Sequence, residues 1–343
     1  MRFIQVGVGG FGGVWVKVLK ENPAVEVVGL VDVSQEALQK ACAEGGHDRK
    51  ICFRSLAQAL KRAPADAIVS CTPPRFHKHD VVMALRAGLH AISEKPMADS
   101  LAACKAMLKT AIATGKTYAV SQNYRYGPPM WTLAKVVRSG RLGKVGQVKL
   151  DFFKGVDFGG GFRHDMAYPL VVDMSIHHFD LIRSITGLDM VSVQGTAWNP
   201  SWSNYKGDCS SALVFEARTG ARLLYSGSWC AKGDFCDWNG NWQIECERGT
   251  VTYQNGEIKI LEAPELYKVE KTEVVPVESP PKTAQAYVLD EFIRAAECGQ
   301  RPATDVYDNI RSVAMIFAAV KAMKTGRKVA VLDPEIEQLL ADR

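Results

Sequence analysis

The chain has 343 residues, of which 47% are hydrophobic and 23% charged, and its formal net charge is +5. This length exceeds one ordinary domain, so we expect two domains with enough residues to bury sizeable cores. Lys and Arg are scattered rather than clustered, which argues against a nucleic-acid partner. No apolar stretch approaches the roughly 20 residues that cross a bilayer, so no membrane partner is expected.

The amino terminus reads as a first strand that enters a glycine-rich turn, not as a signal peptide. The nine cysteines include no C-x-x-C pair, and the neighbourhood of the closest pair, Cys230 and Cys236, offers no histidine at metal-ligand spacing. Reduced, buried thiols explain them better than disulfides or a metal site. We therefore expect a cytoplasmic protein without a bound metal.

The first 120 residues alternate between short apolar runs and helix-like segments. The expected strands are 3–8, 25–31, 67–71, 89–93 and 117–120, and the main expected helices are 11–19, 34–43, 76–87 and 100–114. Ser34 is expected to cap one helix, and Ser55 to begin another short one. Apolar strands separated by helices predict an α/β domain with a doubly wound parallel sheet.

After Gln122 the pattern changes. Helices are expected at 129–139 and 170–186, a strand at 146–156, and many strands with intervening turns between 191 and 261. Helices at 282–298 and 304–325 close the chain. Residues 123–343 therefore read as an α+β domain built on a large, open, mostly antiparallel sheet, and residues 1–122 as the nucleotide-binding domain.

A glycine-rich turn follows the first strand. Its sequence, Gly7-Val8-Gly9-Gly10-Phe11-Gly12, satisfies G-x-G-x-x-G and opens a helix, which is the context that a dinucleotide site requires. Gly7 permits the tight turn, Gly9 lets a pyrophosphate approach the backbone, and Gly12 lets the helix pack closely. The helix amino terminus favours an anion. Gly10 and Phe11 belong to the same expected cofactor contact; the alternative is a glycine turn in an unrelated α/β protein.

Asp32 ends the second expected strand, twenty residues beyond Gly12. A carboxylate there can accept hydrogen bonds from the adenine ribose and repels a 2′-phosphate. Val33 and Ser34 supply no arginine to bind such a phosphate. The pattern favours NAD over NADP, although Asp32 acting as a helix cap is the alternative.

Two polar segments follow the expected strands 67–71 and 89–93. Ligands of open parallel sheets bind beyond the carboxyl ends of strands, so both segments should border the cofactor. Lys95 could hydrogen-bond the reacting oxygen there, or be a surface lysine before a turn proline. His77 starts a helix, so capping competes with cofactor contact. The residues concerned are Thr72, Pro73 and His77 in the first segment and Glu94, Lys95 and Pro96 in the second.

A polar stripe runs along the apolar helix expected at 170–186. At about 3.6 residues per turn, Asp173, His177, Asp180 and Ser184 share one narrow face. Buried carboxylates and imidazoles need partners or a ligand. Asp173 and His177 are four residues apart, so the carboxylate could orient an imidazole that accepts a substrate proton. A purely structural Asp–His–Asp network is the alternative, and the spacing does not match a zinc motif.

These pieces, in this order, resemble the Gfo/Idh/MocA family of glucose–fructose oxidoreductases and inositol dehydrogenases. The resemblance covers nearly the whole chain and rests on the glycine turn, Thr72-Pro73 with His77, Glu94-Lys95-Pro96, and Asp173 with His177 and Asp180. It implies a Rossmann domain followed by an open-faced sheet domain through which such proteins often form dimers or tetramers, with final helices that pack back on the Rossmann domain. Ser175 stands where many relatives carry glycine, which suggests a subgroup.

The resemblance also implies roles for individual residues. Lys95, Asp173 and His177 would form the catalytic constellation, with His177 as acid/base, Lys95 polarising the hydroxyl, and Asp173 binding substrate or orienting His177. The segment from Gln122 to Tyr126 would border cofactor and substrate. The expected substrate contacts are Lys95, Tyr124, Arg125, Arg163, His164, Tyr168, Asp173, His177 and one of Trp229 or Trp238. Each of the aromatic residues could equally belong to a core.

The sequence thus predicts an NAD-linked dehydrogenase that oxidises a hydroxyl carbon of a sugar, inositol or sugar derivative. One alternative is a glycoside hydrolase or lyase that uses NAD for transient oxidation. Another is a non-catalytic, nucleotide-sensing regulator, which would have no need for Lys95, Asp173 and His177 together.

Overall fold

The computed structural model describes residues 1–342, which form two compact units. The first comprises Met1–Asn123 and Ala284–Ile310, and the second comprises Tyr124–Thr283 and Arg311–Asp342. The first unit holds a six-stranded sheet in which every neighbouring pair is parallel. In spatial order its strands are β3 (Cys52–Phe53), β2 (Glu26–Val31), β1 (Arg2–Val6), β4 (Ala67–Ser70), β5 (His90–Ser93) and β6 (Tyr118–Val120).

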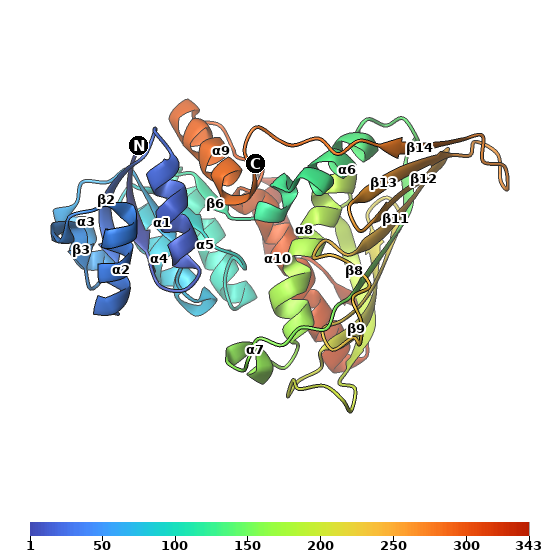
Figure 1. Cartoon of the computed structure of the whole chain (residues 1–343), viewed down its shortest axis with the longest axis horizontal. Helices are drawn as coiled ribbons and strands as arrows, with labels where there is room; N and C mark the ends of the chain where they lie inside the picture. Colours follow the sequence, from blue (N-terminus) through green and yellow to red (C-terminus); the bar gives the residue numbers. More distant parts are fainter. Residues whose placement is uncertain (343) are drawn as a thin grey trace. The chain divides into compact units, whose positions relative to one another are not determined.

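Helices connect these strands, as the sequence predicted (Figure 1). They are α1 (Gly12–Glu21), α2 (Gln35–Gly45), α3 (Leu56–Arg62), α4 (Pro74–Arg86) and α5 (Leu101–Thr114), and α9 (Ala284–Cys298) joins them from late in the chain. The predicted cap at Ser34 is confirmed, because its hydroxyl accepts a hydrogen bond from the first turn of α2. The helix start predicted at Ser55 is confirmed too, and its hydroxyl also accepts from the first turn of α3. A one-turn 3₁₀ helix, Arg49–Ile51, precedes β3.

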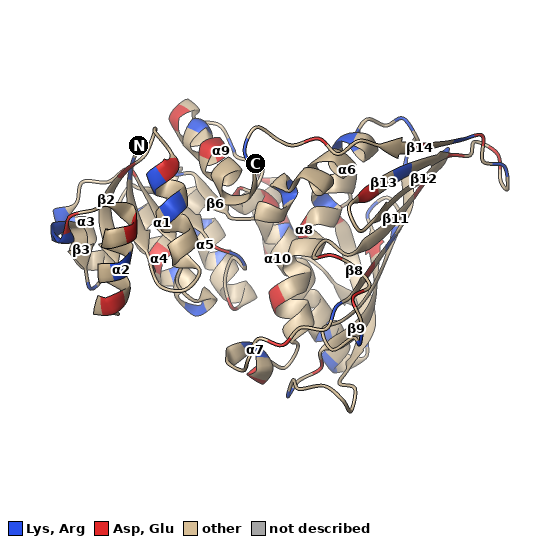
Figure 2. Cartoon of the chain, viewed as in Figure 1, with Lys and Arg blue, Asp and Glu red and all other residues tan. Residues whose placement is uncertain are grey.

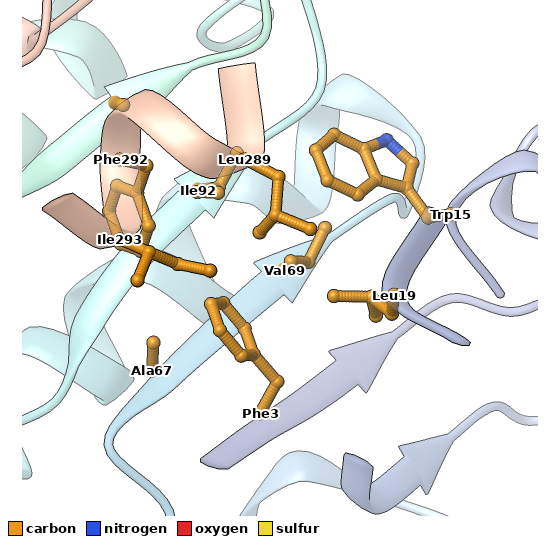
Figure 3. Packing of buried hydrophobic residues seen from close by; sticks show 10 residues of the cluster. Phe3, Trp15, Leu19, Ala67, Val69, Ile92, Leu289, Phe292 and Ile293 are labelled. Atoms are coloured by element: carbon orange, nitrogen blue, oxygen red, sulfur yellow. The ribbon is translucent and has the colours of Figure 1, made fainter. Parts of the chain in front are cut away.

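One core of the first unit joins residues that are far apart in the sequence. Phe3 and Trp15 pack in it with Leu289, Phe292 and Ile293 of α9 (Figure 3). Phe3 and Phe292 lie 6.2 Å apart between ring centroids. Burying aromatic and aliphatic side chains of this size is worth roughly 1.5–3 kcal/mol each. Helix α9 is therefore part of the nucleotide-type unit, although almost 300 residues separate its end from the first strand.

The second unit is built on a nine-stranded mixed sheet. Its spatial order is β14 (Lys271–Val275), β13 (Glu257–Glu262), β12 (Gly249–Gln254), β11 (Asn241–Cys246), β7 (Val145–Phe153), β10 (Arg222–Ser228), β9 (Ser210–Ala217), β8 (Met190–Trp198) and β15 (Val329–Ala330). Strands β7 and β10 pair in parallel, and all the other neighbours are antiparallel. The predicted mostly antiparallel sheet is confirmed.

Burial alternates along these strands, which places one face of the sheet in a core. In β7, Val148, Leu150 and Phe152 are buried, whereas Lys149 and Phe153 are exposed. The helices of the unit are α6 (Pro128–Arg138), α7 (Phe162–Asp165), α8 (Ser175–Thr186), most of α10 (Val306–Thr325) and α11 (Pro334–Ala341). Among the described residues of this unit, helices cover one face of the sheet and leave the other open (Figure 1).

Helix α8 is almost wholly buried against this sheet. Phe179 packs on Phe215 and Tyr225, with ring centroids 4.9 and 5.2 Å away. The chain reaches α8 through a π-helical turn, Leu170–Met174. The sequence predicted one regular helix from residue 170, so the first turn of that prediction is wrong. A π turn is wider than an α turn and changes the angles between its residues and those that follow.

Basic and acidic residues are interspersed over both units (Figure 2). In the described part of the chain, no helix is long and apolar enough to cross a membrane. Residues 1–342 also contain no group of three or more His, Cys, Asp or Glu side chains arranged to hold a metal ion.

Candidate active site

The glycine turn lies between β1 and α1, where the sequence placed it. Gly7 has φ +82°, and a Cβ there would lie 2.9 Å from the backbone of Cys71 and Thr72. A Cβ on Gly12 would lie 2.3 Å from the carbonyl oxygen of Gly7. Gly9 meets nothing closer than 3.6 Å, so the fold itself does not demand glycine at that position. This difference fits a turn in which Gly7 and Gly12 shape the backbone and Gly9 leaves space for a ligand.

The close backbone contact at Gly12 predicts that a larger residue there destabilises the protein, and the neighbouring Gly13 provides a control. Gly12→Ala should destabilise the protein by about 3 kcal/mol, because backbone must move to admit the methyl group. Gly13, the next residue of α1, has no atom within 4 Å of its Cβ position. Gly13→Ala should raise stability by up to about 1 kcal/mol, because alanine favours helix. Thermal unfolding of both variants without cofactor measures the difference, and equal effects would contradict the packing role of Gly12.

The carboxylate of Asp32 stabilises the glycine turn through hydrogen bonds. Its Oδ2 accepts hydrogen bonds from the backbone N–H groups of Val8 (2.9 Å) and Gly9 (3.3 Å). Its Oδ1 accepts from Ser34 N (2.8 Å), while the hydroxyl of Ser34 caps α2. A carboxylate offers about four lone-pair positions, so Asp32 retains acceptor capacity for a ribose hydroxyl.

His77 connects the two loops that follow β4 and β5. Its Nε2 lies 2.7 Å from the carbonyl oxygen of Thr72, and its Nδ1 lies 3.0 Å from that of Pro96. The side chain is fully buried, and this burial lowers the pKa of its imidazole. The geometry assigns His77 a positioning role between the two loops, with Thr72 and Pro73 at the start of the first.

Glu94 connects the loop of Lys95 to α1. Its Oε1 accepts a hydrogen bond from Trp15 Nε1 (2.7 Å), and its Oε2 accepts from the backbone N–H of Lys95 (3.1 Å). Burial raises the pKa of this carboxyl. Trp15 was not among the predicted site residues, because an aromatic residue in the first turns of a helix is typical of an ordinary core.

Gln122, at the end of β6, carries a buried amide with unused hydrogen-bonding capacity. It is 1% exposed, and within residues 1–342 neither its oxygen nor its nitrogen has a hydrogen-bond partner. Buried amides are normally paired, so a polar group of a ligand is the expected partner. Together with the space at Gly9, this orphaned amide shows that the first unit fits a nicotinamide dinucleotide.

In the second unit, His177 is held by an aromatic ring. The imidazole is 5% exposed and stacks on Tyr124, with ring centroids 3.9 Å apart and an interplanar angle of 14°. Burial, reinforced by the charges of Asp237 and Asp173, raises the pKa of the Tyr124 hydroxyl to about 12. The stack fixes the plane of the imidazole. Tyr124, predicted as a substrate contact, therefore also orients the predicted acid/base.

Asp173 lies in the π turn before α8 and is engaged by an arginine. Its Oδ2 accepts a hydrogen bond from Arg163 Nε at 2.6 Å. The structure thus brings together two residues that the sequence named separately. Arg163 belongs to the short helix α7, just beyond the three consecutive glycines 159–161.

Asp180 occupies the third position of the predicted stripe and is tied into a buried network. Arg125 donates to it from Nε (2.6 Å) and from a terminal nitrogen (2.5 Å). Ser312 of α10 also donates to it (2.8 Å), and Arg183 in turn donates to the Ser312 hydroxyl (3.0 Å). For Asp180, the structure therefore fits the alternative interpretation of the stripe, a structural network. Arg125, which the sequence listed as a substrate contact, has its guanidinium engaged by this carboxylate.

His178, which follows His177 and is not among the predicted contacts, is buried between the Tyr225 hydroxyl (3.2 Å) and the carbonyl oxygen of Trp238 (3.1 Å), and burial lowers its pKa to about 4. The remaining predicted contacts have varied settings. His164 stacks on Tyr205 with centroids 4.9 Å apart. Tyr168 lines a hollow of about 320 Å³ beside α7. Trp229 is buried, whereas Trp238 is exposed.

Each of the two units matches a known protein-family model over part of its length. Residues 1–122 match the model described as "Oxidoreductase family, NAD-binding Rossmann fold", and residues 130–252 match the "GFO/IDH/MocA C-terminal domain". The chain belongs to the Gfo/Idh/MocA family. This oxidoreductase is 30% identical to the protein y4oX of Sinorhizobium fredii, over 96% of this chain and 95% of that one. It is 25% identical to the inositol 2-dehydrogenase of Rhizobium meliloti, over 96% and 99% of the two chains.

A solved structure has the same fold as this Gfo/Idh/MocA oxidoreductase. It is an oxidoreductase from Agrobacterium radiobacter in complex with NAD⁺, L-tartaric acid and magnesium, with a TM-score of 0.87 and 19% identity. The match covers 96% of this chain and 98% of that one. The family and the matching domain identify the first unit as an NAD(P)-binding Rossmann domain.

Proposed function

We propose that this oxidoreductase transfers hydride from a hydroxyl-bearing carbon of a sugar, inositol or sugar derivative to NAD. The observation that carries the proposal is a buried imidazole, His177, stacked on Tyr124, with the carboxylate-bearing Asp173 on the turn just before its helix. An imidazole held in one plane is suited to move a hydroxyl proton while the carbon is oxidised. The inositol 2-dehydrogenase among the relatives supports the same class of substrate.

Each predicted catalytic residue has a separate task in this proposal. His177 accepts the hydroxyl proton. Asp173 binds a neighbouring hydroxyl of the substrate, and Lys95 donates a hydrogen bond to the reacting oxygen, stabilising its alkoxide character. When bound, NAD supplies the hydride acceptor. Gly7, Gly9, Gly10, Phe11, Gly12, Asp32 and Gln122 are proposed to contact it, with Thr72, Pro73, His77 and Glu94 forming or supporting its loops.

The test is spectrophotometric. Purified protein is mixed with NAD or with NADP and a panel of inositols, aldoses, amino sugars and glycosides, and absorbance is followed at 340 nm. Growth of absorbance with a sugar or inositol supports the proposal. Binding of NAD without any reduction overturns it, and product analysis of the glycosides then separates redox-assisted cleavage from a sensing role.

Asp32 should determine the preference for NAD. Asp32→Ala should weaken NAD binding about 10- to 100-fold, because charge-assisted hydrogen bonds to the ribose are worth roughly 1.5–3 kcal/mol. It should also narrow the gap between NAD and NADP, since the repulsion of a 2′-phosphate disappears. Titration of both cofactors by fluorescence measures the two constants. An unchanged ratio of affinities would show that Asp32 serves only the glycine turn.

A second copy of the chain is the proposed partner of the open sheet face, giving a cytoplasmic homodimer or homotetramer. The exposed Val214 lies on β9, whose buried residues alternate with outward-facing ones, and Val274 is exposed on the edge strand β14. Light scattering of the purified protein tests this assembly, and a monomer at micromolar concentration contradicts it.

A further inference from the structure

Arg163 is held in a defined orientation by three groups of its own unit. Its Nε donates to Asp173 (2.6 Å), and its guanidinium carbon lies 4.7 Å from the ring centroid of Phe158 and 4.6 Å from that of Phe162. Aromatic rings over a guanidinium stabilise its charge and limit its rotation. The arginine is therefore preorganised beside the carboxylate that we assign to substrate binding.

The terminal N–H groups of Arg163 have no acceptor among the residues that the structure describes. Among residues 1–342, the only hydrogen bond of this side chain is the one from Nε, and the side chain is 32% exposed. A guanidinium carries five N–H donors in a planar fork, of which the terminal pair matches the two oxygens of a carboxylate. The terminal N–H groups of Arg163 are therefore available to donate hydrogen bonds to a ligand.

The nearby acidic side chains already have other partners. Asp157 accepts from Gly159 N (2.8 Å) and lies 3.4 Å from His164 Nε2. Asp165 pairs with Lys206 at 2.7 Å. No acid of this segment is therefore left to fill the terminal edge of Arg163.

The aromatic residues beneath Arg163 add a second unfilled donor. Phe158 packs edge-on against Trp229, with centroids 5.3 Å apart. Trp229 is 1% exposed, and its Nε1–H has no acceptor within the described residues. Buried indole N–H groups usually find a partner. The cluster built by Arg163, Phe158 and Trp229 therefore has an excess of donors, which suits a ligand with oxygen acceptors.

We infer that the substrate is a sugar acid, whose carboxylate binds the terminal N–H groups of Arg163 while a hydroxyl carbon reaches Asp173 and His177. This inference rests on the proposed function and narrows it from sugars in general to aldonates or uronates. Arg163 already shares its single positive charge with Asp173, so what it offers a ligand is its terminal N–H donors, whose spacing suits the two oxygens of a carboxylate. A phosphate dianion would require more positive charge than this cluster supplies.

The test compares acids with their neutral counterparts. The probes are D-glucuronate against D-glucose, D-galacturonate against D-galactose, and D-gluconate against D-glucitol, with D-glucose 6-phosphate as the phosphate probe. Binding to the NAD-loaded protein is measured by calorimetry, and turnover is measured at 340 nm. The proteins are the wild type, Arg163→Gln and Lys206→Gln. Lys206→Gln removes a nearby positive charge without touching the aromatic cluster, so it controls for general electrostatics.

The wild type should favour an acid over its neutral counterpart by roughly 10- to 100-fold, the value of a charge-assisted pair. Arg163→Gln should abolish that preference, chiefly through KM, whereas Lys206→Gln should retain it.

The inference is overturned if no acid binds better than its counterpart, or if the phosphate binds best. It is also overturned if Arg163→Gln weakens acid and neutral sugar equally, since the arginine then acts only through Asp173. Preferential binding of an acid without NADH formation would instead overturn the proposed function and leave carboxylate recognition standing.

Discussion

Replacing His177 with alanine should lower turnover about 10²- to 10⁴-fold while leaving the affinity for NAD almost unchanged. The first effect is the usual contribution of a positioned acid/base. The second follows from the division of the chain, because His177 belongs to the second unit, whereas the glycine turn, Asp32 and Gln122 belong to the first. Steady-state kinetics with the substrate found in the screen, together with fluorescence titration of NAD, measure the two quantities. A collapse of NAD binding would mean that His177 is structural.

Tyr124 offers a matched control for this experiment. Tyr124→Phe keeps the ring that stacks on His177 at 3.9 Å and removes only the hydroxyl, whereas Tyr124→Leu removes the stack. If the ring orients the imidazole, Tyr124→Leu should lower kcat much more than Tyr124→Phe does. Equal losses would assign the effect to the hydroxyl and make Tyr124 a substrate contact instead.

The features that the sequence predicted well depend on short stretches of chain. The glycine turn, the cap at Ser34, the helix start at Ser55 and the alternation of β7 each follow from a few neighbouring residues, whose preferences are physical and local. The parallel order of the first sheet follows as well, because apolar strands separated by helices leave few alternatives. For the same reason the glycine turn and Asp32 could be joined into one expected site.

The features that the sequence missed join residues distant along the chain. Trp15 and Glu94 are 79 positions apart, and nothing in the neighbourhood of either residue points to the other. The π turn at Leu170–Met174 was missed for a different reason: its residues follow the same apolar periodicity as a regular helix. Arg163 was named as a substrate contact, but its bond to Asp173 depends on a glycine-rich segment whose path no local pattern fixes.

Only part of the setting of Asp180 follows from the sequence. A carboxylate on a helix that is apolar on both flanks must have a partner, and this could be deduced from sequence. Which residue supplies the positive charge could not be deduced, because Arg125 lies 55 positions away, beyond a different helix. The predicted polar stripe, for which a catalytic and a structural interpretation were both open, divides into His177, whose imidazole stacks on Tyr124, and Asp180, which forms a buried ion pair with Arg125.

The pair of Arg125 and Asp180 carries the largest stability prediction. Their side chains are 9% and 2% exposed, so Arg125→Gln leaves a carboxylate buried without its cation. Removing one partner of such a pair costs roughly 3–5 kcal/mol. Lys135→Gln is the control in the same unit, because its pair with Glu278 is more than half exposed and should be worth less than about 1 kcal/mol. Tryptophan fluorescence during urea unfolding reports the difference, since six of the seven tryptophans, all except Trp15, belong to the second unit.

Neutralising the carboxylate as well should recover part of this loss. In the double variant Arg125→Gln with Asp180→Asn, neither charge of this pair is left, and the new amide oxygen at position 180 can still accept a hydrogen bond from the Ser312 hydroxyl. Its free energy of unfolding should therefore exceed that of Arg125→Gln alone, although Asp180→Asn alone strands the arginine and destabilises. Additive losses would show that the two side chains act independently and that packing, not charge, makes Arg125 important. Recovery would show that the charge of Asp180 is the reason for the arginine, and hence that Arg125 stabilises the helix carrying His177 rather than recognising substrate.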